Sequence, residues 1–142
     1  MITTEKFYLF DVGVANYLAR QQPRIGSPTF GKAFEHYILM ELKAFQAYRN
    51  PEMPVTFWRT STGREVDFIL GDKDLAIEIK ASSRIHESDI RSLQALLEDG
   101  PVKKCCVVSL EKQKRQLTKN IEAIPWQQFV ERLWRDEFKL LP

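Results

Sequence analysis

The chain contains 142 residues, with 21 Lys or Arg against 19 Asp or Glu, so its formal net charge is +2 at pH 7. At about 100–200 residues per domain, this length is too short for a complete ATPase motor, a solenoid array or a large barrel enzyme. Hydrophobic residues make up 44% and charged residues 28%, which argues against intrinsic disorder. The near-neutral charge neither indicates nor excludes a nucleic-acid partner, because such binding depends on how charges cluster.

The sequence carries no sign of export or of a membrane anchor. No apolar run approaches the ~20 residues of a membrane-spanning helix, and the N-terminus lacks the basic stretch and apolar core of a signal peptide. Cys105 and Cys106 are neighbours, and a disulfide between adjacent residues would be strained, so we expect two reduced cysteines inside a strand. We therefore expect a cytoplasmic protein with no membrane partner.

The predicted elements of the N-terminal part are mainly helical. An aromatic run from Lys6 to Phe10 predicts a short strand, and Asp11 is placed to cap a helix over Val12 to Arg20. After a loop with several Pro and Gly residues, apolar residues at helical spacing predict the longest helix, from Thr29 to Arg49. Asn50-Pro51 ends this helix.

The apolar pattern then changes to a period of two, which predicts β-strands. The elements expected from there on are strands Val55 to Thr60, Glu65 to Leu70 and Leu75 to Lys80, a helix from Glu87 to Asp99, strands Lys103 to Leu110 and Ile121 to Ile124, and a closing helix that begins near Pro125. This order favours an α/β fold with a mixed sheet and helices packed against it. No linker divides the chain, so we expect one domain over residues 1–142.

Two of these strands form a predicted hairpin that brings carboxylates together. The four-residue loop Gly71 to Asp74 fixes the register, which places Asp67 opposite Glu78 and, further along the same face, Glu65 opposite Lys80. Opposed carboxylates repel each other, and a shift of one residue would separate them. The other face of the hairpin is predicted to be an apolar wall of Val66, Phe68, Leu70, Leu75, Ile77 and Ile79.

Three interpretations of the polar face remain open. It is the solvent-facing side of an amphipathic hairpin, or a surface ion pair of little energetic weight, or a divalent metal site. In the third case a cation between Asp67 and Glu78 cancels their repulsion, and Lys80 steers or helps to deprotonate a metal-bound water. Glu35 borders the apolar stripe of the long helix and is either a further member of this site or an edge glutamate that reaches water.

Three stretches of the chain carry a resemblance to a known family: KFYLFDVGVANYL at 6–18, GKAFEHYILMEL at 31–42 and WRTSTGREVDFILGDKDLAIEIKAS at 58–82. They resemble the C-terminal domain of a group of prokaryotic AAA+ ATPases of unsettled function. Glu35, Asp67 and the Glu78-x-Lys80 pattern are similar to the PD-(D/E)XK nuclease fold. The resemblance implies a restriction-endonuclease-like fold in which Asp67 and Glu78 bind Mg²⁺ or Mn²⁺, Glu35 supports the metal and Lys80 is the catalytic lysine.

The implied activity is phosphodiester hydrolysis in DNA by a metal-dependent endo- or exodeoxyribonuclease. Because the fold also hosts binding modules, the alternative is a non-catalytic regulatory, DNA-binding or assembly domain that works with an AAA+ ATPase in cis or in trans. We expect no ATP site on this chain, since its only Gly-Lys pair, Gly31-Lys32, lacks the rest of a phosphate-binding loop. The chain is then a C-terminal fragment of a larger ATPase or a stand-alone relative.

Residues near these segments are candidates for contacts with a phosphate backbone, although each also fits ordinary solvated surface. The candidates are Lys32, Arg59, Arg64 and Gln94. We expect no zinc site, because His36 and His86 have no partner at zinc-ligand spacing. The basic cluster from Lys112 to Lys119 is predicted to be a solvated loop.

Overall fold

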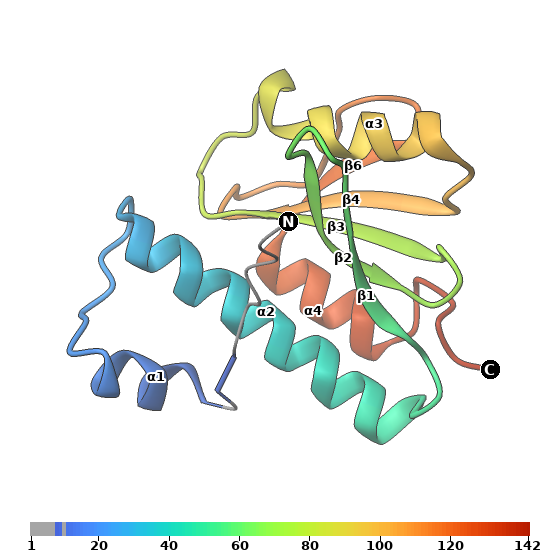
Figure 1. Cartoon of the computed structure of the whole chain (residues 1–142). Helices are drawn as coiled ribbons and strands as arrows, with labels where there is room; N and C mark the ends of the chain where they lie inside the picture. Colours follow the sequence, from blue (N-terminus) through green and yellow to red (C-terminus); the bar gives the residue numbers. More distant parts are fainter. Residues whose placement is uncertain (1–7, 10) are drawn as a thin grey trace.

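A six-stranded mixed sheet with helices on both faces forms the centre of the computed structural model, which describes residues 8–9 and 11–142 (Figure 1). The elements are α1 (Val12–Leu18), α2 (Pro28–Arg49), β1 (Val55–Arg59), β2 (Glu65–Leu70), β3 (Leu75–Lys80), the 3₁₀ turn η1 (Glu87–Ile90), α3 (Arg91–Asp99), β4 (Lys104–Ser109), β5 (Arg115–Gln116), β6 (Ile121–Pro125) and α4 (Trp126–Trp134). The α/β class predicted from the sequence is confirmed.

The strands lie in the order β1-β2-β3-β4-β6-β5. The pairs β1–β2, β2–β3 and β5–β6 are antiparallel, whereas β3–β4 and β4–β6 are parallel. The pair β3–β4 is parallel because η1 and α3 connect these strands over the sheet, and the segment with β5 makes the connection from β4 to β6. β3 is therefore an interior strand, which explains why five of its six residues are buried.

The core divides into two clusters, one on each face of the sheet. Helices α2 and α4 cover one face and α3 covers the other (Figure 1). The apolar stripe predicted for the long helix is confirmed, since Ile38, Leu42 and Phe45 are fully buried against the first face. On the second face, Leu93 and Leu96 of α3 are fully buried.

Most predicted elements are confirmed with shifts of one or two residues at their ends. Asp11 caps α1 as predicted, with its carboxylate accepting from the Val14 N–H at 2.9 Å. The predicted strand Lys6 to Phe10 falls largely outside the described residues, and Tyr8 and Leu9, which are described, lie in no strand. The segment predicted as a basic loop contains the short strand β5, which has only two residues and no apolar alternation to reveal it.

One predicted side-chain direction is wrong, and a β-bulge is the reason. Between Thr56 and Trp58 the register of β1 advances by two residues, while their partners on β2, Ile69 and Val66, are three residues apart. The extra residue reverses the direction of the side chains beyond it. Val66 therefore packs in the cluster under α3, while Phe68 packs in the cluster under α2 and α4.

The described part of the chain holds no helix with the length and apolar character needed to cross a membrane.

Candidate functional site

The bulge in β2 coincides with the place where β2 and β3 separate, at Asp67. The pairing of these strands follows the predicted register from Leu70↔Leu75 to Phe68↔Ile77, where the paired residues end. Next to them, the Oδ2 atom of Asp67 accepts a hydrogen bond from the backbone N–H of Ile79 at 2.8 Å. A side-chain carboxylate thus accepts from a β3 amide that a regular ladder would pair with a β2 carbonyl.

Glu78 is the buried carboxylate of this site. It is 5% exposed, its Oε1 lies 3.0 Å from the Nζ atom of Lys80, and its Oε2 has no hydrogen-bond partner among the described residues. Burial raises the pKa of Glu78 above the ordinary 4.5, and the charge of Lys80 offsets only part of this effect. Burial alone would lower the pKa of Lys80, but the attraction of Glu78 outweighs it and the pKa of Lys80 is raised.

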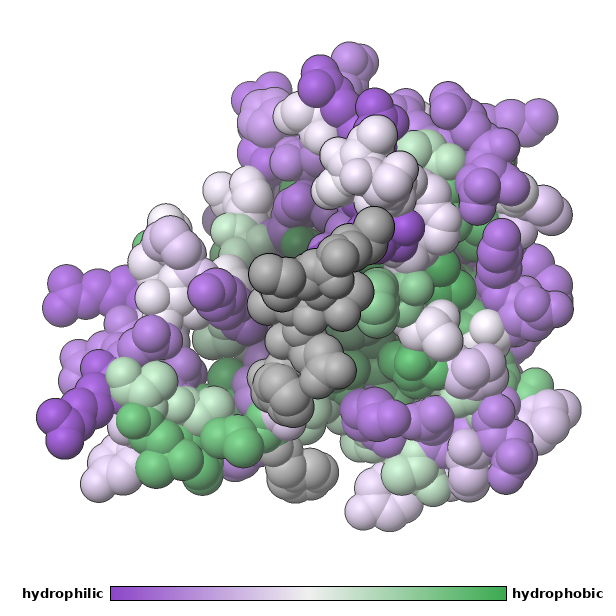
Figure 2. Space-filling view, viewed as in Figure 1, coloured by the Kyte–Doolittle hydropathy of each residue, from purple (hydrophilic) through white to green (hydrophobic). Residues whose placement is uncertain are grey.

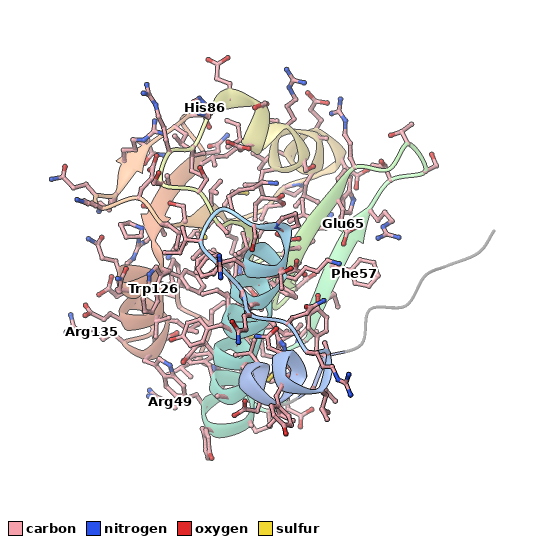
Figure 3. All side chains as sticks on the ribbon, turned by 90° about the vertical axis from the view of Figure 1, so that its left-hand side faces the viewer. Arg49, Phe57, Glu65, His86, Trp126 and Arg135 are labelled. Atoms are coloured by element: carbon pink, nitrogen blue, oxygen red, sulfur yellow. The ribbon has the colours of Figure 1, made fainter. Side chains whose placement is uncertain are left out.

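Glu65 is held at the edge of the same site by the neighbouring strand. Its Oε2 lies 2.5 Å from the Nη2 atom of Arg59, which faces it across β1 and β2. The predicted pairing of Glu65 with Lys80 is not among the ion pairs of the described residues, because Lys80 pairs along its own strand with Glu78. Figure 3 shows Glu65 and Phe57 near the β1–β2 edge of the sheet, with His86 over the turn before α3.

Glu35, on α2, contacts a residue that the sequence argument did not select. The hydroxyl of Tyr8 donates to the Oε1 atom of Glu35 at 2.5 Å. Burial raises the pKa of Tyr8, and so do the hydrogen bond and charge of Glu35 and, more weakly, the charges of Asp67 and Glu65. Tyr8 therefore lies within electrostatic reach of three carboxylates that come from α2 and β2.

The four predicted nucleic-acid contacts are all exposed but have different surroundings. Lys32 lies one turn before Glu35 on α2, and Arg64 lies in the β1–β2 turn beside the site. Arg59 is engaged by Glu65. Gln94 lies on the exposed side of α3, where no described contact links it to the carboxylates.

The carboxylates do not form a ready-made metal cage. Within residues 8–9 and 11–142, no group of three or more His, Cys, Asp or Glu side chains is arranged to hold a metal ion. The predicted set of Glu35, Asp67 and Glu78 is therefore not gathered around one point in this conformation. The chemistry that remains available is that of two neighbouring carboxylates on β2 and β3, together with the ammonium group of Lys80.

A separate hollow lies beyond the carboxyl ends of β3 and β4. A cavity of about 630 Å³ lies there, lined by Arg84, Ile85, His86, Glu87, Ile90, Glu111, Arg115, Gln116 and Leu117. Glu111 is buried and accepts from the Ile85 N–H at 2.8 Å and from Arg115 Nη2 at 2.9 Å. The sequence argument missed this pair, because residues 111–115 form no helix and their i, i+4 spacing therefore carried no pairing signal.

Together, the fold and the site define a mixed α/β domain with an acidic site where two antiparallel strands separate. The chain matches the family described as a domain of unknown function (DUF4143) over residues 30–129, and it belongs to this family. The matched range includes Glu35, Asp67, Glu78 and Lys80 but not Tyr8. No curated protein and no solved structure matches the chain.

Proposed function

We propose that this domain binds Mg²⁺ or Mn²⁺ through Asp67 and Glu78 and hydrolyses phosphodiester bonds in DNA. The observation that carries the proposal is the buried Oε2 atom of Glu78, which lacks a hydrogen-bond partner among the described residues. A buried carboxylate oxygen without a partner is destabilising, and a bound cation would relieve this penalty. The resemblance of the residue pattern to PD-(D/E)XK nucleases supports the same function.

The donor set at this position fits a hard cation. Mg²⁺ is usually held by one or two carboxylates and keeps several waters, so it does not need an all-protein cage. Asp67 and Glu78 would hold the ion, and Glu35 would support it from α2. When bound, such an ion lowers the pKa of a coordinated water and stabilises the charge that develops on phosphorus.

The neighbouring residues of the chain would bind and orient the nucleic acid. Lys80 pairs with Glu78 at 3.0 Å, and in this proposal its ammonium group would bind a phosphate oxygen near the cation. Arg64 and Lys32 are exposed and would contact the flanking phosphates. Arg59 contributes less, because Glu65 already neutralises it.

The test is calorimetric titration with Mn²⁺ followed by incubation with supercoiled and single-stranded DNA. We expect wild type to bind Mn²⁺ and to cut DNA, and Asp67→Asn and Glu78→Gln each to lower the Mn²⁺ affinity at least tenfold and to abolish cleavage. Glu98→Gln, at an exposed position on α3, is the matched control and should behave as wild type. A wild-type protein that neither takes up Mn²⁺ nor cuts either DNA would contradict the proposal.

The second candidate is a non-catalytic DNA-binding or assembly domain associated with an AAA+ ATPase in the cytoplasm, and α1 favours it. This helix has no buried residue, and its Tyr17 and Leu18 side chains are 82% and 66% exposed. Figure 2 shows hydrophobic side chains gathered over α1, on the same side of the molecule as the N-terminal half of α2. If the domain binds DNA and leaves it intact with either metal, this second function is the correct one.

A further inference from the structure

We infer that Tyr8 is a positioning residue of the acidic site, whose hydroxyl fixes Glu35 beside the carboxylates of β2. The inference rests on the proposed function, because it assigns Tyr8 a role in binding the same cation. It also extends the site beyond residues 30–129, the range that matches the family.

Two consecutive residues, Tyr8 and Leu9, contact two consecutive residues of α2, Glu35 and His36. The Tyr8 hydroxyl donates to Glu35 Oε1 at 2.5 Å, and the backbone carbonyl of Leu9 is hydrogen-bonded to the Nε2 atom of His36. The ring of Tyr8 also packs edge-on against the ring of His36, with their centroids 5.5 Å apart. His36 is buried, so the partner of this segment is a rigid part of α2.

Polar and aromatic contacts attach Tyr8 and Leu9 to α2. The helix that follows, α1, also contacts α2 but buries none of its own residues. That Tyr8 is half-buried among acidic groups indicates a role in the site rather than in the core.

The hydroxyl of Tyr8 lies close to carboxylates of both α2 and β2, because Glu35, Asp67 and Glu65 all act on it electrostatically. A neutral O–H donor fixes the Oε1 atom of Glu35 without adding charge, which would set the direction of this carboxylate beside the proposed cation. Outer residues that orient ligands in this way typically contribute 10–100-fold to metal affinity or activity.

The test compares Mn²⁺ binding by calorimetry in wild type, Tyr8→Phe, Glu35→Gln and the double variant. Tyr8→Phe removes only the hydroxyl and leaves the packing on His36 intact, so the fold should be preserved, which far-UV circular dichroism checks. We expect about tenfold weaker Mn²⁺ binding for Tyr8→Phe. The double variant should bind Mn²⁺ no more weakly than Glu35→Gln alone, because both substitutions remove the same contact between Tyr8 and Glu35.

The matched control is Tyr48→Phe, at the other end of α2, where the tyrosine is 80% exposed. It should bind Mn²⁺ as wild type does. If wild type binds Mn²⁺ and Tyr8→Phe binds it equally well, the role of Tyr8 is refuted and the proposed metal site stands. If wild type binds no Mn²⁺, the metal site itself is refuted, and the role of Tyr8 with it.

Discussion

Two glutamates of similar burial lie at or just beyond neighbouring strands and show opposite behaviour. Glu78, on β3, is 5% exposed, and Glu111, just after β4, is 8% exposed. Burial raises the pKa of Glu78, whereas hydrogen bonds from Arg115 and the Ile85 N–H outweigh burial at Glu111 and lower its pKa. The two carboxylates differ because hydrogen bonds prevail at Glu111, whereas burial prevails at Glu78 over its contacts with Lys80 and the Asp67 backbone.

The comparison separates a structural carboxylate from a functional candidate. Glu111 ties the loop after β3 to the loop after β4, since Arg115 also donates to the Ile85 carbonyl. Both of its oxygens lie within hydrogen-bond distance of Arg115. Glu78 has one oxygen on Lys80 and one without a partner among the described residues, so it retains the capacity to bind a further positive group.

The largest expected effect on stability is that of Glu111→Ala. It leaves the buried Ile85 N–H without its acceptor, whereas the partly exposed Arg115 guanidinium can turn to water, so we expect the free energy of unfolding to fall by about 2 kcal/mol. Urea unfolding at pH 7 measures the change. Glu98→Ala, on the exposed side of α3, should change it by less than about 0.5 kcal/mol. Equal effects of the two substitutions would contradict the structural role of Glu111.

The pH dependence of stability should have opposite signs at the two positions. The pKa of Glu111 is lowered in the folded state, so its contribution is present above the unfolded value of about 4.5 and is lost as the pH falls below it. The pKa of Glu78 is raised, so ionisation destabilises the fold as the pH rises through 4.5 toward the higher folded value.

Urea unfolding between about pH 3.5 and pH 7 of wild type, Glu111→Gln and Glu78→Gln measures both terms. The stability lost in Glu111→Gln should be greatest at pH 7 and should vanish at low pH. Relative to wild type, Glu78→Gln should become more stable as the pH rises. Parallel curves for the two variants would show that the two carboxylates do not differ in this way.

The smallest expected effect is that of Glu78→Gln at pH 7 without metal. The amide removes a destabilising buried charge but also the ion pair with the partly exposed Lys80, so the two effects largely cancel. We expect a protein no less stable than wild type, within about 1 kcal/mol, although it should have lost its Mn²⁺ affinity. A loss of stability as large as that of Glu111→Ala would make Glu78 a structural residue.

The sequence predicted the hairpin well but not the region around its bulge. The turn from Gly71 to Asp74 sets the pairing of Leu70 with Leu75, and this local relation is visible in the chain. The direction of Val66 depends on β1, whose register with β2 shifts by one residue at Asp67 and Phe68. No periodicity in β2 alone records that shift, so Val66 was assigned to the wrong face.

The same distinction applies to the candidate site. Glu35, Asp67, Glu78 and Lys80 were selected from their sequence pattern, and the structure places them on α2, β2 and β3. Tyr8 was hidden in an aromatic run that predicted a strand, and only the tertiary structure shows its hydrogen bond to Glu35, 27 positions away. Glu111 likewise bonds Ile85, 26 positions away.

By itself, the sequence determined the helices, the main strands, the hairpin register and the identity of the acidic residues, because these follow from local periodicity and turn length. Only the tertiary structure decided that Asp67 lies at a bulge and that the Tyr8 hydroxyl donates to Glu35. It also decided that one oxygen of Glu78 has no hydrogen-bond partner among the described residues, while both oxygens of Glu111 contact Arg115. Each of these features depends on contacts that form only in the folded chain. The pKa of a carboxylate reflects its burial and its hydrogen-bond partners, and neither follows from the residue type alone.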